Sequence, residues 1–326
     1  MFGKTKQKSE LRFDVVNKDW VVVAEGRGKR PEDFKKKKQE EVVDNMPCAF
    51  CDYFCSEKFR DKNFAVVPNK FPAFFLQKNK ETKSENALFQ KIPSNGFHEV
   101  VVFNDHSKQL WDFSFNEWEE LLGIYQQRYI DLSKEDFVNY VSVFHNHGKM
   151  AGASLIHPHS QIMGIPFFDK NISSPLNSSK EFFKEKSQCL FCAINRAEKS
   201  AKTRIIFENS NFLAMCPFAS KVNFEIVISP KNHLPYFEKI SEQEKSDLAQ
   251  IFQIVLAKIN KGLGSPDYNF YLKTSPCDDR EYPFFHWHFT IMPRISVWAG
   301  FELGTGIEII TMPPEKAADY LKKIKI

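Results

Sequence analysis

The sequence predicts an α+β fold of two tandem modules, each an antiparallel sheet with flanking helices. Short runs rich in β-branched and aromatic residues alternate with amphipathic runs, which is typical of strands and helices within one domain. A Cys-x-x-Cys pair, a lone His and a His-x-His occur in this order within residues 48–159 and again within residues 189–288. With 326 residues the chain is long enough for two domains. We therefore expect one ancestral module used twice, in residues 1–170 and 171–326.

In the first half, residues 13–16 and 20–24 predict a strand pair, because both runs are β-rich and a polar turn sequence separates them. Further strands are expected at residues 64–67, 99–103 and 140–144. Residues 114–131 predict a helix, since their large apolar side chains recur at three- and four-residue spacing. Residues 169–188 are polar and rich in serine, and they predict a linker between the modules.

The second half repeats this layout. Strands are expected at residues 205–207, 224–228 and 270–272. A helix is expected from about Ser241 to Ile259, because it opens with Ser241-Glu242-Gln243-Glu244, which matches a capping box. A final helix is expected over residues 314–324.

Composition and charge exclude several classes of protein. The formal net charge is +4 and no long stretch concentrates it, so a nucleic-acid-coating protein with a continuous basic face is disfavoured. No apolar run approaches the ~20 residues of a membrane span, and residues 1–8 do not resemble a secretory signal. We therefore expect a cytoplasmic protein without a membrane or nucleic-acid partner. Seven cysteines, an odd number, favour metal or core roles over disulfides.

The repeated Cys and His residues predict two metal sites. A Cys-x-x-Cys turn brings two thiolates together, and two imidazoles complete a tetrahedral Cys2His2 shell. The expected ligands are Cys48, Cys51, His106 and His157 in the first half and Cys189, Cys192, His233 and His286 in the second. Four ligands leave no open position, so we expect two structural Zn²⁺ ions per chain. Buried cysteines or a redox pair are the alternative, and Cys55 could compete for the first site.

Residues 154–162 carry the most reactive pattern in the chain, with His157 and His159 two residues apart. In a strand these side chains share a face, so one can hold the metal while the other faces substrate. A neutral imidazole is a good nucleophile for phosphorus, and the phospho-imidazolium that forms is a good leaving group. Backbone N–H groups of the small-residue loop 146–154 could bind phosphate, and Ser154, Ser160 and Gln161 could donate hydrogen bonds to it. The alternative is a strand with core histidines.

Together these motifs resemble the galactose-1-phosphate uridylyltransferase family, the nucleotidyltransferase branch of the histidine-triad superfamily. The resemblance runs nearly end to end, through Asp19-Trp20-Val21-Val22-Val23, Arg27-Gly28-Lys29-Arg30-Pro31, Cys48 and Cys51, Asn69-Lys70-Phe71-Pro72, Asp105-His106-Ser107-Lys108, Asn146-x-Gly148, Gly152-x-Ser154, His157-Pro158-His159-Ser160-Gln161, His286-x-His288 and Gly300-Phe301-Glu302. It implies that His159 is the nucleophile and becomes nucleotidylated, with Gln161 and Ser154 binding the transferred phosphoryl group. The expected substrate-binding residues are Arg27, Arg30, Asn69, Phe71, Asn146, Ser160, Lys273, His288 and Glu302.

The reaction implied by the resemblance is transfer of a uridylyl group from UDP-glucose to a hexose 1-phosphate such as galactose 1-phosphate, by a ping-pong mechanism in a homodimer. Three departures point to an alternative. The second Cys-x-x-Cys resembles the two-zinc branch that includes ADP-glucose phosphorylases, and Ser160 replaces a commoner Gly in the same way. Lys70 stands where uridylyltransferases often carry an Asp near the ribose. The alternative reaction is therefore adenylyl transfer from ADP-glucose to phosphate.

Gln161 favours transfer over hydrolysis. Histidine-triad hydrolases carry a third His at this place, whereas Gln cannot exchange protons near neutral pH. A sugar phosphate is a stable anionic leaving group that needs little protonation, so Gln161 is free to hold the phosphoryl oxygens. A non-catalytic, zinc-stabilised nucleotide-binding protein is the remaining alternative, from a different class of function.

Overall fold

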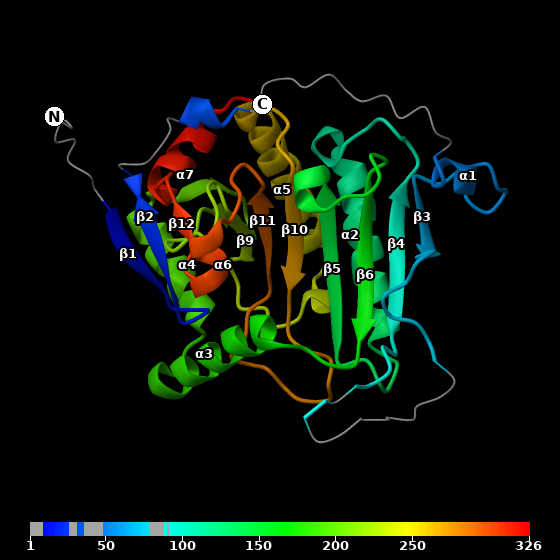
Figure 1. Cartoon of the computed structure of the whole chain (residues 1–326), viewed down its shortest axis with the longest axis horizontal. Helices are drawn as coiled ribbons and strands as arrows, with labels where there is room; N and C mark the ends of the chain where they lie inside the picture. The colour runs from blue at the N-terminus through cyan, green and yellow to red at the C-terminus, as the bar shows by residue number, and fades with distance from the viewer. Residues whose placement is uncertain (1–8, 26–30, 36–47, 78–87, 90) are drawn as a thin grey trace.

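The computed structural model describes residues 9–25, 31–35, 48–77, 88–89 and 91–326 (Figure 1). The strands are β1 (Ser9–Asp14), β2 (Asp19–Ala24), β3 (Phe64–Pro68), β4 (Phe97–Phe103), β5 (Tyr140–His147), β6 (His159–Ile165), β7 (Ile205–Glu208), β8 (Phe212–Met215), β9 (Ile226–Pro230), β10 (Tyr268–Lys273), β11 (His288–Pro293) and β12 (Ile309–Ile310). The α-helices are α1 (Cys51–Phe54), α2 (Phe115–Leu132), α3 (Lys170–Lys186), α4 (Leu190–Ala201), α5 (Glu242–Leu263), α6 (Gly300–Thr305) and α7 (Pro314–Lys323). None of the helices in these ranges combines the length and apolar character needed to cross a membrane.

Nine strands form one sheet in the order β3-β4-β6-β5-β10-β11-β9-β8-β7, and every neighbouring pair is antiparallel. The first four strands of this order precede residue 170 and the other five follow it. The halves meet where β5 pairs with β10, with Asn146 opposite Asn269. The predicted α+β class with antiparallel sheets is confirmed, and the two halves contribute to a single sheet. The module boundary at residue 170 stays a prediction.

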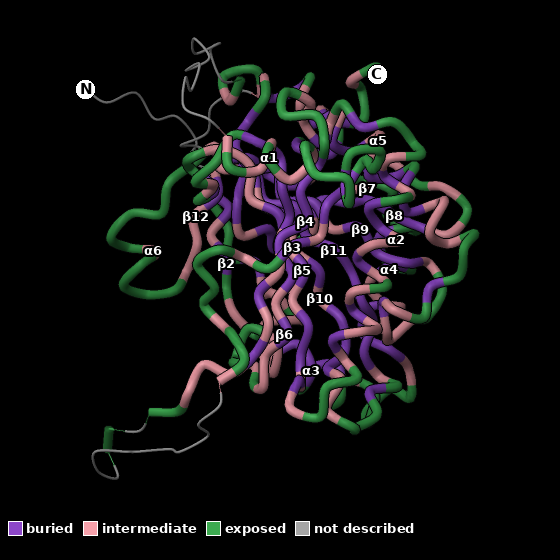
Figure 2. Tube along the Cα trace, turned by 90° about the vertical axis from the view of Figure 1, so that its right-hand side faces the viewer, coloured by how far each residue is buried: buried purple, intermediate pink, exposed green. Residues whose placement is uncertain are grey.

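Helices α2 and α5 cover one face of this sheet and form the main core with it. Trp118 of α2 stacks on Phe252 of α5, with ring centroids 4.7 Å apart, and both side chains are fully buried. Each helix begins with the capping box that its sequence shows, at Ser114 and at Ser241, so its first N–H groups have side-chain partners. The buried positions keep the predicted helical spacing. Figure 2 shows the buried backbone concentrated in the sheet and these helices.

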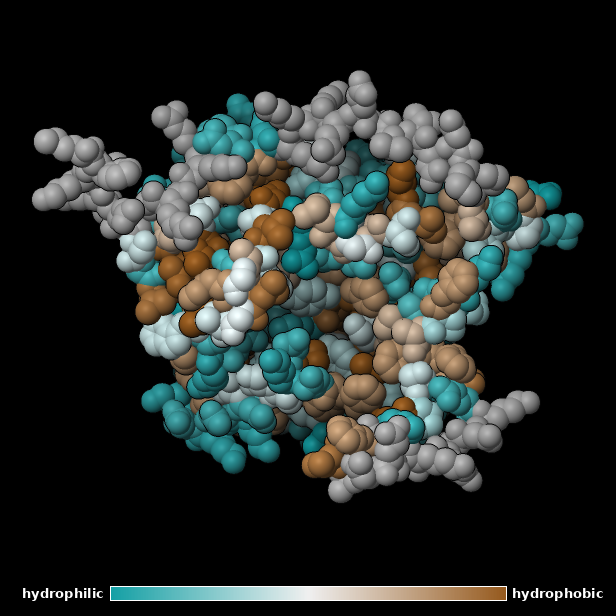
Figure 3. All heavy atoms as spheres, viewed as in Figure 1, coloured by the Kyte–Doolittle hydropathy of each residue, from teal (hydrophilic) through white to brown (hydrophobic). Residues whose placement is uncertain are grey.

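Strand alternation sets which side chains lie on the other face of the sheet. On β6, Ile162 belongs to the helix-covered core, so His159 and Gln161 lie on the opposite face. On β10 and β11 the core residues are Phe270 and Ile291, and their strand neighbours likewise lie on that opposite face. Figure 1 looks onto this face, and Figure 3 shows that it is hollowed near its middle.

A second sheet joins the two ends of the chain. β1 is antiparallel to β2, and β12 runs parallel to β2, in the order β1-β2-β12. The predicted strand pair is confirmed, although β1 begins earlier and ends at Asp14. It ends there because the Asp14 carboxylate accepts hydrogen bonds from the backbone N–H groups of Val16 and Asn17, which turns the chain.

The predicted linker at residues 169–188 is wrong, because residues 170–186 form α3. Asp169 caps this helix by accepting from the N–H of Lys170. Ser178 and Ser179 are compatible with a helix here because both are small and buried, and the Ser178 hydroxyl donates to the carbonyl of Ser174 within α3. Pro175 lies inside α3, in its second turn, where the missing N–H costs one helical hydrogen bond.

Candidate active site and metal centres

The first group of predicted ligands converges as expected. Cys48 Sγ lies 3.4 Å from His157 Nδ1, Cys51 Sγ lies 3.4 Å from His106 Nδ1, and the two Nδ1 atoms are 3.1 Å apart. A tetrahedral ion with Zn–S of about 2.3 Å and Zn–N of about 2.05 Å requires S···N separations of about 3.6 Å and N···N separations of about 3.3 Å. All four donor atoms lie within 4.8 Å of one another. The donor set therefore fits a metal ion of the size and geometry of Zn²⁺.

The second group repeats this geometry in the other half. Cys192 Sγ lies 3.6 Å from His233 Nδ1 and 3.5 Å from His286 Nδ1, and Cys189 Sγ lies 3.9 Å from His286 Nδ1. A hydrogen bond from the Cys189 thiol, together with the nearby imidazoles, lowers the pKa of Cys192. A bound cation would favour deprotonation of both thiols.

Backbone carbonyls orient one imidazole of the first group and both of the second, where His233 Nε2 lies 2.8 Å from the carbonyl oxygen of Pro283. His157 Nε2 lies 2.5 Å from the carbonyl oxygen of Phe103, and His286 Nε2 lies 2.9 Å from that of Pro230. Since a carbonyl only accepts, each Nε2 carries the proton and each Nδ1 keeps its lone pair for a metal. Both groups contain four protein ligands, so a bound ion would have a structural role. Cys55 belongs to neither group and is exposed.

His159 begins β6 and presents one ring nitrogen to the open face of the sheet. Its Nδ1 lies 2.8 Å from the carbonyl oxygen of His157, so Nδ1 carries the proton and Nε2 holds the lone pair. Burial lowers the pKa of His159, which keeps the ring neutral at pH 7. The ring of Phe50 packs edge-on against it, with centroids 5.0 Å apart. The imidazole is therefore held in the tautomer that a nucleophile for phosphorus requires.

His98 orients Gln161, a role that the sequence did not reveal. The backbone N–H of Ala73 donates to His98 Nδ1 at 3.2 Å, so His98 Nε2 carries the proton and donates to Gln161 Oε1 at 2.7 Å. With its oxygen occupied, Gln161 has its amide N–H groups available on the face that carries His159. This contact depends on the pairing of β4 with β6, which the spacing of residues along the sequence does not predict.

The predicted nucleoside-pocket residues lie beside this pair. The Asn69 N–H donates to the carbonyl of His98 at 2.8 Å, and the Asn69 side chain accepts from the N–H of Phe71 at 2.8 Å. The ring of Phe71 is 82% exposed, so it is accessible to a ligand. Asn146 lies on β5, where its Oδ1 accepts from the Asn269 side chain at 2.7 Å. The chain thus brings Asn69, His98 and Gln161 together by direct contacts.

The small-residue loop after β5 differs from the predicted phosphate cradle. Gly148 has φ of +80°, and a Cβ there would lie 2.2 Å from the Asp267 carboxyl carbon, so only glycine fits. The N–H of Met150 donates to Asp267, and those of residues 151–153 donate to carbonyls within the loop. These N–H groups are already engaged and cannot be offered to phosphate. Ser154 follows the loop and is exposed.

Ser160 does not lie with the other predicted substrate-binding residues. It is 3% exposed, and its hydroxyl contacts the Tyr125 hydroxyl at 2.5 Å and His145 Nδ1 at 3.2 Å. Because it neighbours His159 on the strand, its side chain points into the helix-covered core. The predicted contact between this side chain and substrate is therefore not formed, and Ser160 serves the core instead.

Lys273 and His288 lie on β10 and β11, two and three strands from β6. At about 4.8 Å per strand, they stand about 10 and 14 Å away from it. Glu302 lies on α6, beside β12 and toward the opposite end of the large sheet from β6 (Figure 1). Arg27 and Arg30 fall outside the described residues.

Comparison with known proteins agrees with this architecture. Residues 2–168 match the profile described as galactose-1-phosphate uridyl transferase, N-terminal domain. The chain belongs to this family. Residues 112–324 also match a domain of unknown function, DUF4921. The predicted family is thereby confirmed.

Curated members of the family carry two different names. The chain is 36% identical to "ADP-glucose phosphorylase" of Arabidopsis thaliana, over 98% of this chain and 94% of that protein. It is 29% identical to "Galactose-1-phosphate uridylyltransferase" of Thermotoga maritima, over 97% of this chain and 99% of that protein. The solved Arabidopsis ADP-glucose phosphorylase with bound ADP-glucose superposes with a TM-score of 0.80 at 33% identity, over 98% of this chain and 100% of that one. These relatives are nucleotidyl-transferring enzymes.

Proposed function

We propose that this chain transfers a nucleotidyl group from a nucleotide sugar to a phosphate-bearing acceptor through His159. The observation that carries the proposal is the fixed tautomer of His159, whose Nδ1–H donates to the carbonyl of His157 while Nε2 faces outward. In the first step Nε2 attacks the α-phosphorus, the bond to the sugar phosphate breaks, and glucose 1-phosphate leaves. In the second step the acceptor's phosphate oxygen attacks the same phosphorus and frees the imidazole. Two in-line displacements retain configuration at phosphorus.

Gln161 stabilises charge during both displacements. His98 holds its oxygen, so its amide N–H groups can donate to the phosphoryl oxygens as negative charge develops. Since Gln161 neither gains nor loses a proton, it suits a leaving group that is already an anion. We assign the exposed Ser154 hydroxyl to the same phosphoryl group, and Asn69, Phe71 and Asn146 to the nucleotide.

The metal centres are proposed to hold Zn²⁺ and to act through structure. When bound, the ion in the first half would anchor the His157 ring, and the carbonyl of the same residue orients His159. The nucleophile is thus positioned by a metal ligand two residues away in the sequence. The centre in the second half would stabilise the end of β11 in the same way.

Two nucleotide sugars are candidates for the donor. The relative that is 36% identical favours ADP-glucose with inorganic phosphate as acceptor. The uridylyltransferase that is 29% identical supports UDP-glucose with a hexose 1-phosphate as acceptor, which the sequence analysis placed first. We favour ADP-glucose, because the Cys2His2 centre in the second half and Ser160 also resemble the phosphorylase branch.

Intact-protein mass spectrometry after brief mixing with ADP-glucose or UDP-glucose tests the proposal. We expect a covalent adenylyl adduct with ADP-glucose, and a His159→Gly variant should form no adduct. A uridylyl adduct alone would select the second candidate. Absence of both adducts, or an adduct on another side chain, would contradict nucleotidyl transfer through His159.

Glu302 supports a homodimer. We assign this carboxylate to the sugar hydroxyls, yet in one chain α6 lies beside β12, toward the opposite end of the large sheet from β6 (Figure 1). A second copy would have to supply it to a hexose bound at His159. Mixing inactive His159→Gly and Glu302→Ala proteins under exchange conditions should therefore restore activity in mixed dimers. Failure of the mixture, with subunit exchange verified, would contradict this arrangement.

A further inference from the structure

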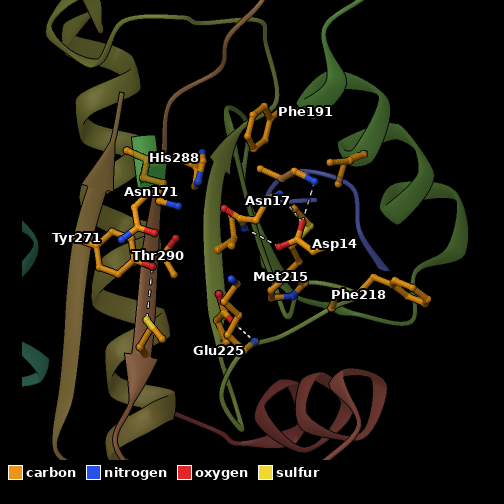
Figure 4. Close-up of a pocket in the computed structure, with 18 of the residues that line it drawn as sticks. Asp14, Asn17, Asn171, Phe191, Met215, Phe218, Glu225, Tyr271, His288 and Thr290 are labelled. Carbon is orange, nitrogen blue, oxygen red and sulfur yellow. Dashed lines mark hydrogen bonds between the residues drawn. The ribbon is translucent and has the colours of Figure 1, made fainter. Parts of the chain in front are cut away.

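A cavity of about 700 Å³ lies over β10 and β11 in the C-terminal half, on the face of the sheet that also carries His159 (Figure 4). The turn after β1, the helix α4 and the end of β8 enclose it from the other sides. Its volume lies within the range of sites that hold small ligands. The proposed transfer reaction makes no use of this cavity.

The cavity contains a counterpart of the nucleophile and its surroundings. His288 Nδ1 lies 3.2 Å from the carbonyl oxygen of His286, just as His159 is held by His157, so its Nε2 also keeps the lone pair. The Phe191 ring, from the second Cys-x-x-Cys, packs 4.8 Å from the His288 ring, as Phe50 does against His159. Duplication has therefore preserved the local site in both halves.

The sheet supplies the polar floor of the cavity. In the β10–β11 pair Lys273 stands opposite His288, and Tyr271 stands opposite Thr290, so all four side chains lie on one face. Within the described part of the chain, the Lys273 ammonium has neither a hydrogen-bond nor an ion-pair partner, and its only recorded close contact is with the Tyr271 ring. Burial and the nearby Lys221 lower the pKa of Lys273 despite the opposing charges of Glu225 and the aspartates Asp14 and Asp19, and a phosphate beside the ammonium would favour its charged form further.

An acidic side chain and several aromatic rings of the cavity lining indicate which class of ligand would fit. Glu225 is 8% exposed and accepts a hydrogen bond from the backbone N–H of Lys221. The oxygens of this side chain can accept hydrogen bonds from sugar hydroxyls. Aromatic rings of Phe13, Phe191 and Trp298 line the cavity and suit a planar base.

We propose that this cavity binds a nucleoside monophosphate, with its phosphate at Lys273 and Thr290 and its ribose hydroxyls toward Glu225. The site binds rather than transfers, because Thr290 stands two residues after His288, where the nucleophile's strand carries Gln161. Thr290 offers one hydroxyl and lacks the two amide N–H groups that would hold phosphoryl oxygens. The cavity is thus a second nucleotide site, separate from the one at His159.

Equilibrium dialysis of the full-length protein against labelled AMP and UMP tests this proposal. We expect one class of sites whose Kd rises at least tenfold in Lys273→Met and stays unchanged in Lys199→Met, which removes an exposed lysine on α4. Thr290→Val, a smaller change, should weaken the same class of sites. Because these variants leave His159 in place, failure of the proposed reaction would not alter the result.

Two outcomes would overturn the proposal. One is that neither Lys273→Met nor Thr290→Val changes the Kd of any AMP or UMP site seen in the wild-type protein. The other is inorganic phosphate or the free nucleoside binding as tightly as the nucleotide at the affected sites. Intact-protein mass spectrometry of the same variants measures the covalent adduct at His159, and so follows the proposed reaction independently of binding in the cavity.

Discussion

Replacing His98 with Phe should slow nucleotidyl transfer about tenfold without removing any group that touches the substrate. The His98 Nε2–Gln161 Oε1 hydrogen bond is 2.7 Å long, and His98 is only 9% exposed. A buried hydrogen bond of this kind contributes about 1.5 kcal/mol, which corresponds to about a tenfold change in rate. Gln161→Ala removes the donor itself and should cost about 100- to 1000-fold.

The double variant separates positioning from a general loss of stability. If His98 acts only through Gln161, His98→Phe should add nothing to the effect of Gln161→Ala. The assay is kcat/KM for glucose 1-phosphate release from the preferred nucleotide sugar, with the melting temperature measured alongside. His98→Gln, which can still donate to Gln161, should recover part of the rate. Additive losses in the double variant, or a wild-type rate for His98→Phe, would refute the reasoning.

Three other predictions concern the metals, the core and pH. Cys51→Ala should lower the metal content from two ions to one per chain by elemental analysis and lower the melting temperature; unchanged content would contradict the first centre. Ser160→Ala should reduce the free energy of unfolding in urea by about 1–3 kcal/mol, because the buried Tyr125 hydroxyl loses its acceptor. If Ser160→Ala instead raises the KM for the nucleotide sugar and leaves stability unchanged, Ser160 contacts the substrate. Burial raises the pKa of Glu225 from 4.5 to about 7, so the folded state holds this proton more tightly than the unfolded chain does. Stability should therefore fall as pH rises from about 5 through 7, and Glu225→Gln should flatten that slope in urea titrations; an equal slope in both proteins would contradict this assignment.

The sequence predicted the two groups of Cys and His residues, the helices that became α2 and α5, and the cap at Ser241, because each rests on local or repeated spacing. Both ligand groups converge as expected, and α2 and α5 begin at their capping boxes. The prediction of a linker at residues 169–188 was wrong because serine-rich sequence is typical of linkers. In the structure Ser178 and Ser179 are instead small buried residues of α3. Spacing predicted which Cys and His side chains converge more reliably than it predicted the structure of the segments between them.

Strand pairing explains the errors in the substrate site. Ser160 was assigned to the substrate because of its place in the motif, yet the two-residue period of β6 turns it toward Tyr125. Lys273 and His288 belong to the same motif series but lie two and three strands from β6, because β5 and β10 stand between. His98 was overlooked because its partner Gln161 lies on β6, two strands after β4 in the chain and separated from it by α2 and β5. Strand order is a long-range property that a single sequence does not display.

The β5–β10 seam also has a bearing on how such a chain arose. A single module ending near residue 170 would leave the outer edge of β5 with free N–H and C=O groups. Two separate copies joining along that edge would have formed the same continuous sheet as a twofold assembly. Fusion of two such copies into one polypeptide would make that joint permanent, and it would leave each half free to diverge.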